Sequence, residues 1–356
     1  MAVPLKINDR LVGPGHPTYI VAEMSANHGH DINEAKRLFD AAKEAGADAI
    51  KLQTYTPDTL TIDCDRPDFL LGEGTIWAGR KLYDLYGEAY TPWDWHAELK
   101  EHANQLGMDL FSTPFDATAV DFLMDLDIPV YKVASFENAD IPLLRKIAST
   151  GKPVIMSTGM ADLGTVEYSV RTLREHGCEQ LALLKCTSAY PAPVEEANLH
   201  TIPHLAQTFD VVAGLSDHTM GSTVPVAAVA LGACIIEKHF IRDRSVGGPD
   251  ASFSMTPDEF KEMVDSVRIV ERALGRVSYD LTPKQVASKV FRRSLYIVED
   301  VRAGEVVTLE NVRVIRPGYG LEPRYYDEVI GKRFSEDLPR GTALSWDLLS
   351  APERAD

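Results

Sequence analysis

Short apolar runs recur along the first 275 residues, and each of them ends in a group of polar residues. Segments of helical length fill the intervals, so the pattern predicts strands that alternate with helices. Eight runs are predicted as strands: residues 19–26, 49–52, 109–111, 130–134, 153–156, 181–184, 211–215 and 234–236. Eight strand–helix units in about 250 residues are typical of a closed (β/α)8 TIM barrel. An open doubly wound sheet is the alternative, and the lack of a GxGxxG motif after the first strand disfavours it.

The intervals between the strands carry signals for helix starts. Asp31 is a predicted cap with Glu34 three residues later, and residues 256–275, which open with Thr-Pro, form the last predicted helix. Residues 57–90 differ, because they are rich in aromatic residues and lack a periodic pattern, and we predict an irregular segment there. Its aromatic side chains, Trp77, Tyr83 and Tyr86 among them, are expected to pack against the barrel more than to recognise a ligand.

The periodic pattern stops after Gly275, which sets the predicted domain organisation. The barrel is predicted at residues 1–275, a linker at 276–290, and a small, mostly β domain at 291–356. In the last segment, short apolar runs and turns such as residues 316–320 replace the long helices. A module of about 60 residues buries little apolar surface by itself, so we expect it to dock on another surface.

Polar residues at the strand ends of a barrel converge on one face, where active sites lie. Alternation along the strands supports this, since Lys51 and Gln53 share a side of their strand. Lys132 has the opposite parity to Ser135 and Glu137, so one or both of these residues are predicted to lie beyond the strand.

Two neighbouring strands lead to a histidine. Residues 211–253 are predicted as strand, helix and strand, with His218 after the first strand and His239 after the second. Adjacent parallel strands would place both imidazoles side by side, and neutral imidazoles can share one divalent metal. The alternative is two unrelated histidines, one solvated and one hydrogen-bonded in a core. Four nearby carboxylates offer oxygen ligands: Asp217, Glu237, Asp243 and Asp250.

The strand ends also carry cations, hydroxyls and carboxylates. Lys51 and Lys132 would bind phosphate as point charges, unless they simply extend to solvent. Hydroxyl groups that donate to phosphate oxygens are available at Thr113, Ser135, Ser157, Ser188 and Ser216. Glu23 and Glu137 are candidates for general acid or base, although a structural Glu–Lys pair is the competing interpretation. The set predicts metal-assisted chemistry on a phosphorylated small molecule.

Composition narrows the partners and the compartment. The net charge of −17 argues against a general nucleic-acid or anionic-membrane surface, so neither is expected as a partner. No apolar run approaches the roughly 18 residues of a membrane span, and the amino terminus lacks the apolar core of a signal peptide. The four cysteines form no CxxC pair and are expected to be mostly buried thiols, which favours a reducing compartment. We therefore expect a cytoplasmic protein.

Seven segments closely resemble the sialic acid synthase family. They are IVAEMSANH (20–28), IKLQTYTPDT (50–59), FSTPFD (111–116), YKVASFE (131–137), GKPVIMSTGM (151–160), GLSDHT (214–219) and EKHF (237–240). The segments at 292–305 and 316–320 resemble that family's antifreeze-like (SAF) domain. The resemblance implies condensation of phosphoenolpyruvate with an acetamido sugar, in its open aldehyde form, to a nine-carbon ulosonic acid and phosphate. Residues 77–96 and the first two motifs are most similar to the pseudaminic acid branch, with the legionaminic and N-acetylneuraminic acid branches as alternatives.

The resemblance also implies roles for individual residues. His218 and His239 would bind the divalent metal, with Mn²⁺ expected and Mg²⁺ or Co²⁺ as alternatives. Glu137 would be the acid or base, with Glu23 the second catalytic candidate. Arg316 of the small domain would hold an acetamido group. Residues implied around phosphoenolpyruvate are Lys51, Thr113, Lys132, Ser135, Ser157, Ser188, Tyr190 and Ser216. Residues implied at the sugar are Glu23, Gln53 and Asp250.

Two positions depart from the family's pattern. Ser188 stands where the sialic acid branch has an asparagine and is a shorter donor toward phosphate, and Phe136 stands where the family has a glycine. The resemblance further implies a homodimer in which the small domain of one protomer covers the barrel of the other. Three rival interpretations remain: a synthase of 3-deoxy sugar acids, a carbohydrate-binding protein on an inactive barrel, and a hydrolytic metal barrel.

Overall fold

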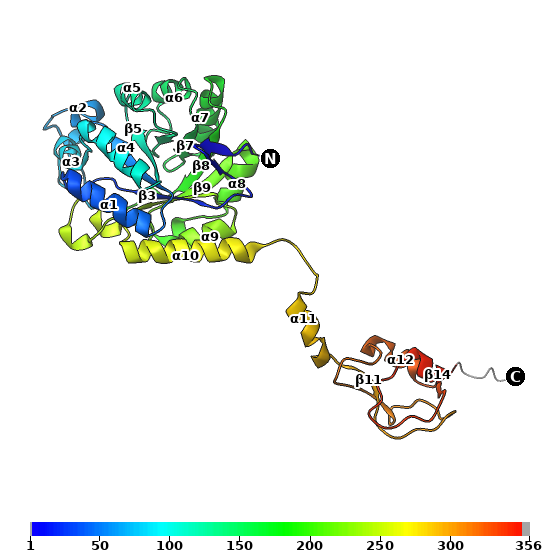
Figure 1. Ribbon diagram of the computed structural model, residues 1–356. Coiled ribbons are helices and arrows are strands. Elements are labelled where there is room, and N and C mark those ends of the chain that lie inside the picture. The colour runs from blue at the N-terminus through cyan, green and yellow to red at the C-terminus, as the bar shows by residue number, and fades with distance from the viewer. Residues whose placement is uncertain (1, 351–356) are drawn as a thin grey trace. The chain divides into compact units, whose positions relative to one another are not determined.

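The computed structural model describes residues 2–350 of a chain that divides into two compact units, Met1–Gly275 and Arg276–Asp356. Figure 1 shows the helices and strands of each unit, coloured along the chain. The two units have separate hydrophobic cores.

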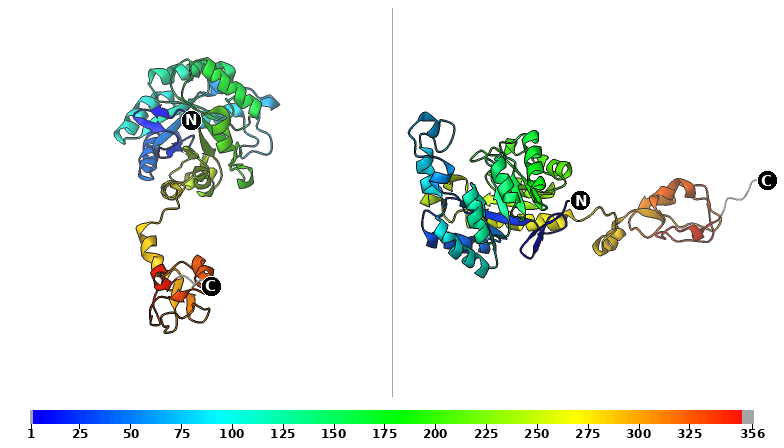
Figure 2. Two further views of the ribbon diagram at one scale, coloured as in Figure 1. Left: turned by 90° about the vertical axis from the view of Figure 1, so that its right-hand side faces the viewer. Right: turned by 90° about the horizontal axis from the view of Figure 1, so that it is seen from above.

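The first unit is a closed barrel, as the sequence predicts. Within residues 2–350 the barrel contains eight parallel strands in the order β10-β3-β4-β5-β6-β7-β8-β9. Figure 2 shows helices around the outside of this barrel. The strands are β3 Tyr19–Glu23, β4 Ala49–Thr54, β5 Asp109–Pro114, β6 Tyr131–Val133, β7 Val154–Ser157, β8 Leu181–Cys186, β9 Val212–Asp217 and β10 Ile235–His239. All except the ends of β4, β5, β8 and β10 are buried throughout, which is typical of strands covered on both faces.

The helices between the strands are held by side-chain caps at their amino ends. Asp31, Asp116, Asp140 and Asp162 each accept a backbone N–H at the start of a helix, which satisfies donors that the helix itself leaves free. The helices around the barrel are α1 Ile32–Glu44, α4 His96–Gln105, α5 Ala117–Asp125, α6 Ile141–Ala148, α7 Leu163–Glu175, α8 Thr201–Phe209, α9 Thr223–Ala230 and α10 Pro257–Leu274. None of the helices in residues 2–350 combines the length and apolar character of a membrane span.

A hairpin at the amino terminus closes one end of the barrel, and the strand pattern did not predict it. Strands β1 Leu5–Ile7 and β2 Arg10–Val12 pair antiparallel. Leu5, Ile7 and Val12 are fully buried and share one hydrophobic cluster with side chains inside the barrel. The left-hand view of Figure 2 shows the amino terminus over the middle of the barrel. Because these side chains pack against the interior of the barrel, the hairpin acts as a plug at this end. Burial of each of them contributes about 1.5–3 kcal/mol.

The segment between β4 and α4 contains two helices, so the prediction of an irregular segment at residues 57–90 is wrong in part. Helix α2 Pro57–Leu60 starts with a capping box between Thr56 and Thr59, and α3 spans Leu82–Ala89. The helices escape the sequence pattern because they are short and α3 fully buries only Leu85.

The second unit contains two antiparallel pairs, β11 Ser294–Ile297 with β12 Val312–Ile315, and β13 Arg333–Phe334 with β14 Leu349–Ser350. Its short helices are α11 Pro283–Ala287, which lies within the segment predicted as a linker, and α12 Tyr326–Val329. Leu295, Ile297, Val312 and Phe334 belong to its core. The small and mostly β character predicted from the sequence is confirmed for this unit.

Candidate active site

The predicted site residues of the first unit gather at the carboxyl end of the barrel. Eight lie in the strands themselves: Glu23 in β3, Lys51 and Gln53 in β4, Thr113 in β5, Lys132 in β6, Ser157 in β7, Ser216 in β9 and His239 in β10. Six lie in the loops that follow strands: Ser135, Glu137, Ser188, Tyr190, His218 and Asp250. Because β6 ends at Val133, Ser135 and Glu137 both lie beyond the strand, as their parity predicts.

Four buried charges form the centre of the site. Lys51 Nζ lies 2.6 Å from Glu23 Oε2 and 3.5 Å from Glu237 Oε1, and Lys132 Nζ lies 3.8 Å from the same oxygen of Glu237. The side chains of these residues are at most 7% exposed. Burial alone would raise the pKa of Glu237, but the positive charges of Lys132 and Lys51 outweigh it and hold that pKa below its ordinary value. The two cations and two anions therefore stabilise one another in the absence of solvent.

Hydroxyl groups surround these charges, as the interpretation of an anion site requires. Lys132 Nζ donates to Ser157 Oγ at 2.7 Å and to the carbonyl of Val133 at 2.9 Å. Lys51 Nζ lies 3.4 Å from Thr113 Oγ1, and Ser216 Oγ donates to Glu237 Oε1 at 2.9 Å. The three hydroxyls are buried. Ser157 and Thr113 accept from the lysines, so their hydroxyl protons are available to an incoming anion, whereas the Ser216 proton is committed to Glu237.

A cradle for a small anion lies next to Lys132, and Gly159 makes the space for it. A Cβ at Gly159 would collide with the hydroxyl oxygens of Ser135 and Ser188. The turn is fixed by Asn138, whose amide nitrogen donates to the carbonyl of Gly159 at 2.8 Å. Two hydroxyls that face one glycine offer convergent donors of the kind that phosphate oxygens accept. The prediction for Ser135 and Ser188 thus gains a partner, Gly159, that the sequence reasoning did not single out.

The two predicted metal ligands lie side by side. The ring centroids of His218 and His239 are 5.3 Å apart, on strand ends that pair in register. His218 Nδ1 lies 3.0 Å from the carbonyl of Thr187, so it donates there and leaves Nε2 with a free lone pair. His239 is buried, which lowers its pKa well below the ordinary value, and its Nδ1 has no hydrogen-bond partner. His239 is therefore in the neutral form that binds a divalent metal, whereas for His218 the lowering of the pKa by burial is outweighed by the hydrogen bond with Cys186, so that its pKa is raised and a bound metal would displace a proton there.

Most of the nearby carboxylates are not metal ligands. Asp217 pairs with Lys238 at 2.5 Å, Asp243 caps an exposed turn, and Glu237 binds the lysines. Asp250 Oδ2 alone approaches, at 3.8 Å from His239 Nδ1. Residues 2–350 contain no group of three or more His, Cys, Asp or Glu side chains placed to hold a metal ion. The residues present fit a metal with two protein nitrogen ligands and open positions for substrate and water.

The residues implied at the sugar form a hydrogen-bonded set through Ser25. Gln53 Nε2 donates to Glu23 Oε1 at 3.2 Å and to Ser25 Oγ at 2.9 Å, and Ser25 Oγ donates to Asp250 Oδ2. Ser25 was absent from the predicted site, although it lies two residues after Glu23 and shares its parity. The set links β3, β4 and the loop after β10 at one side of the histidine pair.

Glu137 has the properties of a group that exchanges protons near neutral pH. Its side chain is largely buried, and burial raises its pKa from 4.5 to about 7. Glu137 Oε2 has no hydrogen-bond partner, so no protein donor is committed to it. A carboxyl with a pKa near the working pH serves equally well as general base and as general acid.

An aromatic cluster borders the histidine pair. The ring of Tyr190 lies 4.4 Å from that of His218 and 5.1 Å from that of Phe253, measured between centroids. The ring of Trp77, from the segment between β4 and α3, lies 5.6 Å from that of Tyr190. Trp77 thus packs at the border of the site, and the expectation that these aromatics serve packing more than recognition stays a prediction.

Glu237 has a role that was not predicted, and Arg316 has a predicted role that the structure does not test. Glu237 was considered only as a metal ligand, whereas it bridges both lysines at the centre of the site. Its parity with His239 already indicates that it points into the barrel. Arg316 directly follows β12 in the second unit, and its role at the sugar stays a prediction.

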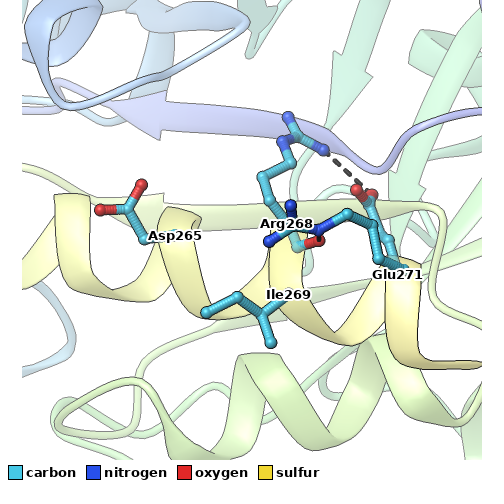
Figure 3. A pocket seen from close by; sticks show the side chains of 5 residues that line it. Asp265, Arg268, Ile269 and Glu271 are labelled. Carbon is cyan, nitrogen blue, oxygen red and sulfur yellow. Dashed lines mark hydrogen bonds and ion pairs between the residues drawn. The ribbon is translucent and has the colours of Figure 1, made fainter. Parts of the chain in front are cut away.

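A hollow on the outer face of α10 does not share the chemistry of this site. It is lined by Asp265, Arg268, Ile269, Glu271 and Arg272 (Figure 3). Arg268 already pairs with Glu271 and Asp48, both at 3.0 Å. The hollow contains no buried unpaired group and none of the predicted site residues.

Comparison with known proteins places this site in a family. The sequence pattern of the NeuB family matches residues 38–279, and that of the SAF domain matches residues 292–350. A pseudaminic acid synthase of Campylobacter jejuni is 47% identical over 326 residues, which cover 92% of this chain and 95% of the relative. The pseudaminic acid synthase of Helicobacter pylori is 43% identical over 332 residues, 93% of this chain and 97% of the relative.

A solved structure agrees with these relatives. The N-acetylneuraminic acid (sialic acid) synthetase of Leptospira borgpetersenii, crystallised with citrate, superposes with a TM-score of 0.71 at 30% identity. The match covers 81% of this chain and 95% of that structure. The resemblance to sialic acid synthases that the motifs indicate is confirmed over both units: the chain belongs to the NeuB family and carries its SAF domain.

Proposed function

We propose that the chain is a pseudaminic acid synthase. It condenses phosphoenolpyruvate with 2,4-diacetamido-2,4,6-trideoxy-β-L-altropyranose and water, and it releases pseudaminic acid and phosphate with cleavage of the C–O bond of phosphoenolpyruvate. The observation that carries the proposal is the position of the hydroxyl cradle at Gly159 and the paired lysines beside the histidine pair at one barrel end. An anionic donor and an aldehyde acceptor would thereby meet at one site.

Phosphoenolpyruvate is proposed to bind through the residues that the cradle and the lysines provide. Ser135 and Ser188 would donate to its phosphate, and Lys132 would balance the phosphate charge. Lys51, with Thr113 beside it at 3.4 Å, would serve the carboxylate. These contacts fix the enol with its C3 carbon toward the sugar aldehyde, which lowers the entropic barrier to the encounter.

A divalent metal, with Mn²⁺ proposed, would be held by the imidazole nitrogens of His218 and His239. When bound there, the metal supplies the polarisation of the sugar aldehyde oxygen. The unpartnered Nδ1 of the buried His239 and the low pKa of its imidazole support this assignment.

The proton chemistry is proposed to fall to Glu137. C3 of the enol forms the new bond to the aldehyde carbon, and positive charge develops at C2. Water adds to C2 while Glu137 accepts one of its protons, and the tetrahedral intermediate then loses phosphate by cleavage of the C2–O bond. The unpartnered Oε2 of Glu137 and its pKa of about 7 allow it to take that proton at neutral pH. Glu23, tied to Lys51, is better placed to orient the sugar with Gln53 and Asp250.

The choice of sugar rests on the identities of the relatives. Identity is 47% and 43% to the two pseudaminic acid synthases and 30% to the sialic acid synthetase structure. The alternatives are the precursors of legionaminic acid and N-acetylneuraminic acid, which belong to the same family.

We also propose a homodimer in which the small domain of one protomer covers the barrel mouth of the other and brings Arg316 to the sugar. Exposed apolar side chains in the loops after six barrel strands support this, because a single folded chain rarely leaves so many around one opening. They are Ile76, Phe136, Met160, Val194, Met220 and Val246, each about half exposed or more.

Light scattering tests the dimer. Met160→Asp is expected to shift the protein toward monomer and lower activity, while Ile269→Asp, at another exposed apolar position on the outside of α10, leaves both unchanged. A fully active monomer would contradict the proposal. The four cysteines are free, which favours a reducing compartment, and we place the enzyme in the cytoplasm.

Phosphate release tests the reaction itself. Three parallel reactions contain the enzyme, Mn²⁺ and phosphoenolpyruvate. Each also contains one sugar: the diacetamido altrose, the legionaminic acid precursor or N-acetylmannosamine. Release with the altrose alone, abolished by EDTA, is the expected result. Release with another sugar alone would make the enzyme a legionaminic or N-acetylneuraminic acid synthase of the same family. No release with any of the three sugars would refute the proposed synthase activity.

A further inference from the structure

Residues 70–81 form a closed loop that hangs over the carboxyl end of the barrel. The two sides of the loop are joined where the N–H of Leu71 donates to the carbonyl of Arg80 at 2.8 Å and the N–H of Gly79 donates to the carbonyl of Leu71 at 2.7 Å. Lys81 ties its base to Asp65 at 2.8 Å. Hydrogen bonds at its base therefore hold the loop in one shape. Its position at the site depends on the contacts of its tip.

Trp77 is the side chain by which this tip contacts the site. Among residues 72–79 Trp77 is half-buried and the others are exposed. Its indole Nε1 donates to the carbonyl of Pro249 at 3.0 Å, and its ring lies 5.6 Å from the ring of Tyr190. Trp77 thus joins the loop after β4 to the loops after β8 and β10, which are distant from it in the sequence.

The two contacts of Trp77 lead to the histidine pair and to Asp250, which is implied at the sugar. Tyr190 packs against His218, with 4.4 Å between ring centroids. Pro249 precedes Asp250, which accepts the Ser25 hydroxyl and lies 3.8 Å from His239. The backbone before Pro249 contains Gly247 and Gly248, with φ angles of 78° and 121°, and glycine has more conformations open to it than other residues because it lacks a Cβ. A hydrogen bond to the carbonyl of Pro249 therefore limits the positions available to Asp250.

We propose that Trp77 is a positioning and specificity-determining residue for the sugar substrate. With Tyr190 and Phe253 it forms an aromatic wall beside the histidine pair, and it fixes the loop that presents Asp250. Such a wall accommodates the methyl groups of a deoxygenated, diacetylated sugar better than the hydroxyls of a hexosamine. The inference rests on the proposed function, since it deepens the choice of sugar at the same site.

The phosphoenolpyruvate side offers an internal reference. The cradle at Gly159 is formed by Ser135 and Ser188, and neither hydroxyl contacts Trp77 in the structure. The resemblance implies Tyr190 at phosphoenolpyruvate, but the hydroxyls proposed to bind the phosphate lie elsewhere, so a loss of the aromatic wall should act mainly on the KM of the sugar. A general loss of folding would lower kcat without separating the two substrates.

The test uses Trp77→Ala, Trp77→Phe and a matched control. Trp93 is also half-buried and donates its indole N–H to a backbone carbonyl, that of Tyr55 at 3.0 Å, but its ring packs against Phe122 of α5. Trp77→Ala is expected to raise the KM of the sugar roughly ten- to a hundredfold, with the KM of phosphoenolpyruvate within about twofold of wild type. Trp77→Phe keeps a ring and recovers most of this loss, and Trp93→Phe has wild-type values for both substrates.

An unchanged sugar KM in Trp77→Ala, or an equal rise in both KM values, would overturn the inference while wild-type turnover still supports the synthase. If the wild type turns over none of the three sugars, the proposed function fails first. The difference in fluorescence between wild type and Trp77→Phe then decides the inference. A change in that difference on addition of one of the sugars supports a sugar contact at Trp77, and no change with any of them refutes it.

Discussion

The carboxylate of Glu237 lies 3.5 Å from Nζ of Lys51, in an ion pair from which solvent is almost entirely excluded. The same oxygen lies 3.8 Å from Nζ of Lys132. One anion thus holds two cations at the place where an anionic substrate is proposed to bind. Removal of the anion has two separable effects, one on folding and one on the substrate.

Replacement of Glu237 by Gln is expected to destabilise the protein by about 3 kcal/mol, because two buried lysines lose a counter-charge. It should also lower kcat/KM for phosphoenolpyruvate by about tenfold or more, because both lysines move from their positions. Chemical denaturation and phosphate release measure the two effects. Asp217→Asn is the control: it breaks the buried pair with Lys238, so stability should fall similarly while kcat/KM stays near wild type.

Replacement of Glu137 by Gln is expected to lower kcat by about 10²- to 10⁴-fold, because the variant cannot accept the proton of water. In the wild type, kcat/KM should rise with pH and level off above a midpoint of about 7, where Glu137 becomes ionised. The variant should lose this midpoint and keep its affinity for Mn²⁺ in calorimetry. Unchanged turnover would remove Glu137 from the mechanism.

The same pKa makes an independent prediction about folding. The unfolded chain releases the Glu137 proton near pH 4.5 and the folded chain near 7, so the folded state binds the proton more tightly. The stability linked to this proton is therefore complete below pH 4.5 and is lost as the pH rises to about 7. Glu137→Gln should gain up to about 3 kcal/mol relative to wild type at pH 8 and nothing at pH 4. Equal differences at both pH values would contradict the raised pKa.

Replacement of Gly159 by Ala fills the proposed phosphate cradle with one methyl group. Because the Cβ would collide with Ser135 and Ser188, the KM of phosphoenolpyruvate is expected to rise at least about tenfold, with a stability loss of about 1–3 kcal/mol. Gly164→Ala in α7 meets only Asp162, at an ordinary 3.6 Å, and should leave the KM unchanged. Steady-state phosphate release at varied phosphoenolpyruvate compares the pair, and equal KM values would exclude the cradle.

Mn²⁺ is expected to raise the thermal midpoint of the wild type, since a ligand that binds only the folded state stabilises it. His239→Ala should lose this shift along with activity. His96→Gln is a suitable control, because His96 is also buried and neutral but bonds to Thr54 at 2.8 Å, away from the histidine pair. A metal-dependent shift that survives in His239→Ala would place the metal elsewhere.

The barrel and most of its strand ends follow from the sequence for a physical reason. Each strand is a nearly continuous apolar run, and parallel strands must point their carboxyl ends to one face. That geometry alone brought Lys51, Lys132, His218 and His239 together. Alternation along the strand further predicted that Ser135, Glu137 or both lie beyond β6, and the structure has both there.

The features that the sequence did not reveal depend on contacts between distant segments. Glu237 gained its role from two lysines on other strands, and Ser25 from Gln53 and Asp250. Trp77 lies in a segment without periodicity, so nothing local distinguished it from the other aromatics. The amino-terminal hairpin was missed because strands of three residues are too short to show alternation.

The hairpin that plugs the amino-terminal end of the barrel also limits the traffic of ligands. Leu5, Ile7 and Val12 are fully buried across that end, so the proposed substrates and products would have to pass through the opposite end, where the site residues gather. A phosphate ion in the proposed cradle would therefore block the next phosphoenolpyruvate. Binding and release would then share one opening, so the order in which substrates bind and products leave would be restricted by the fold.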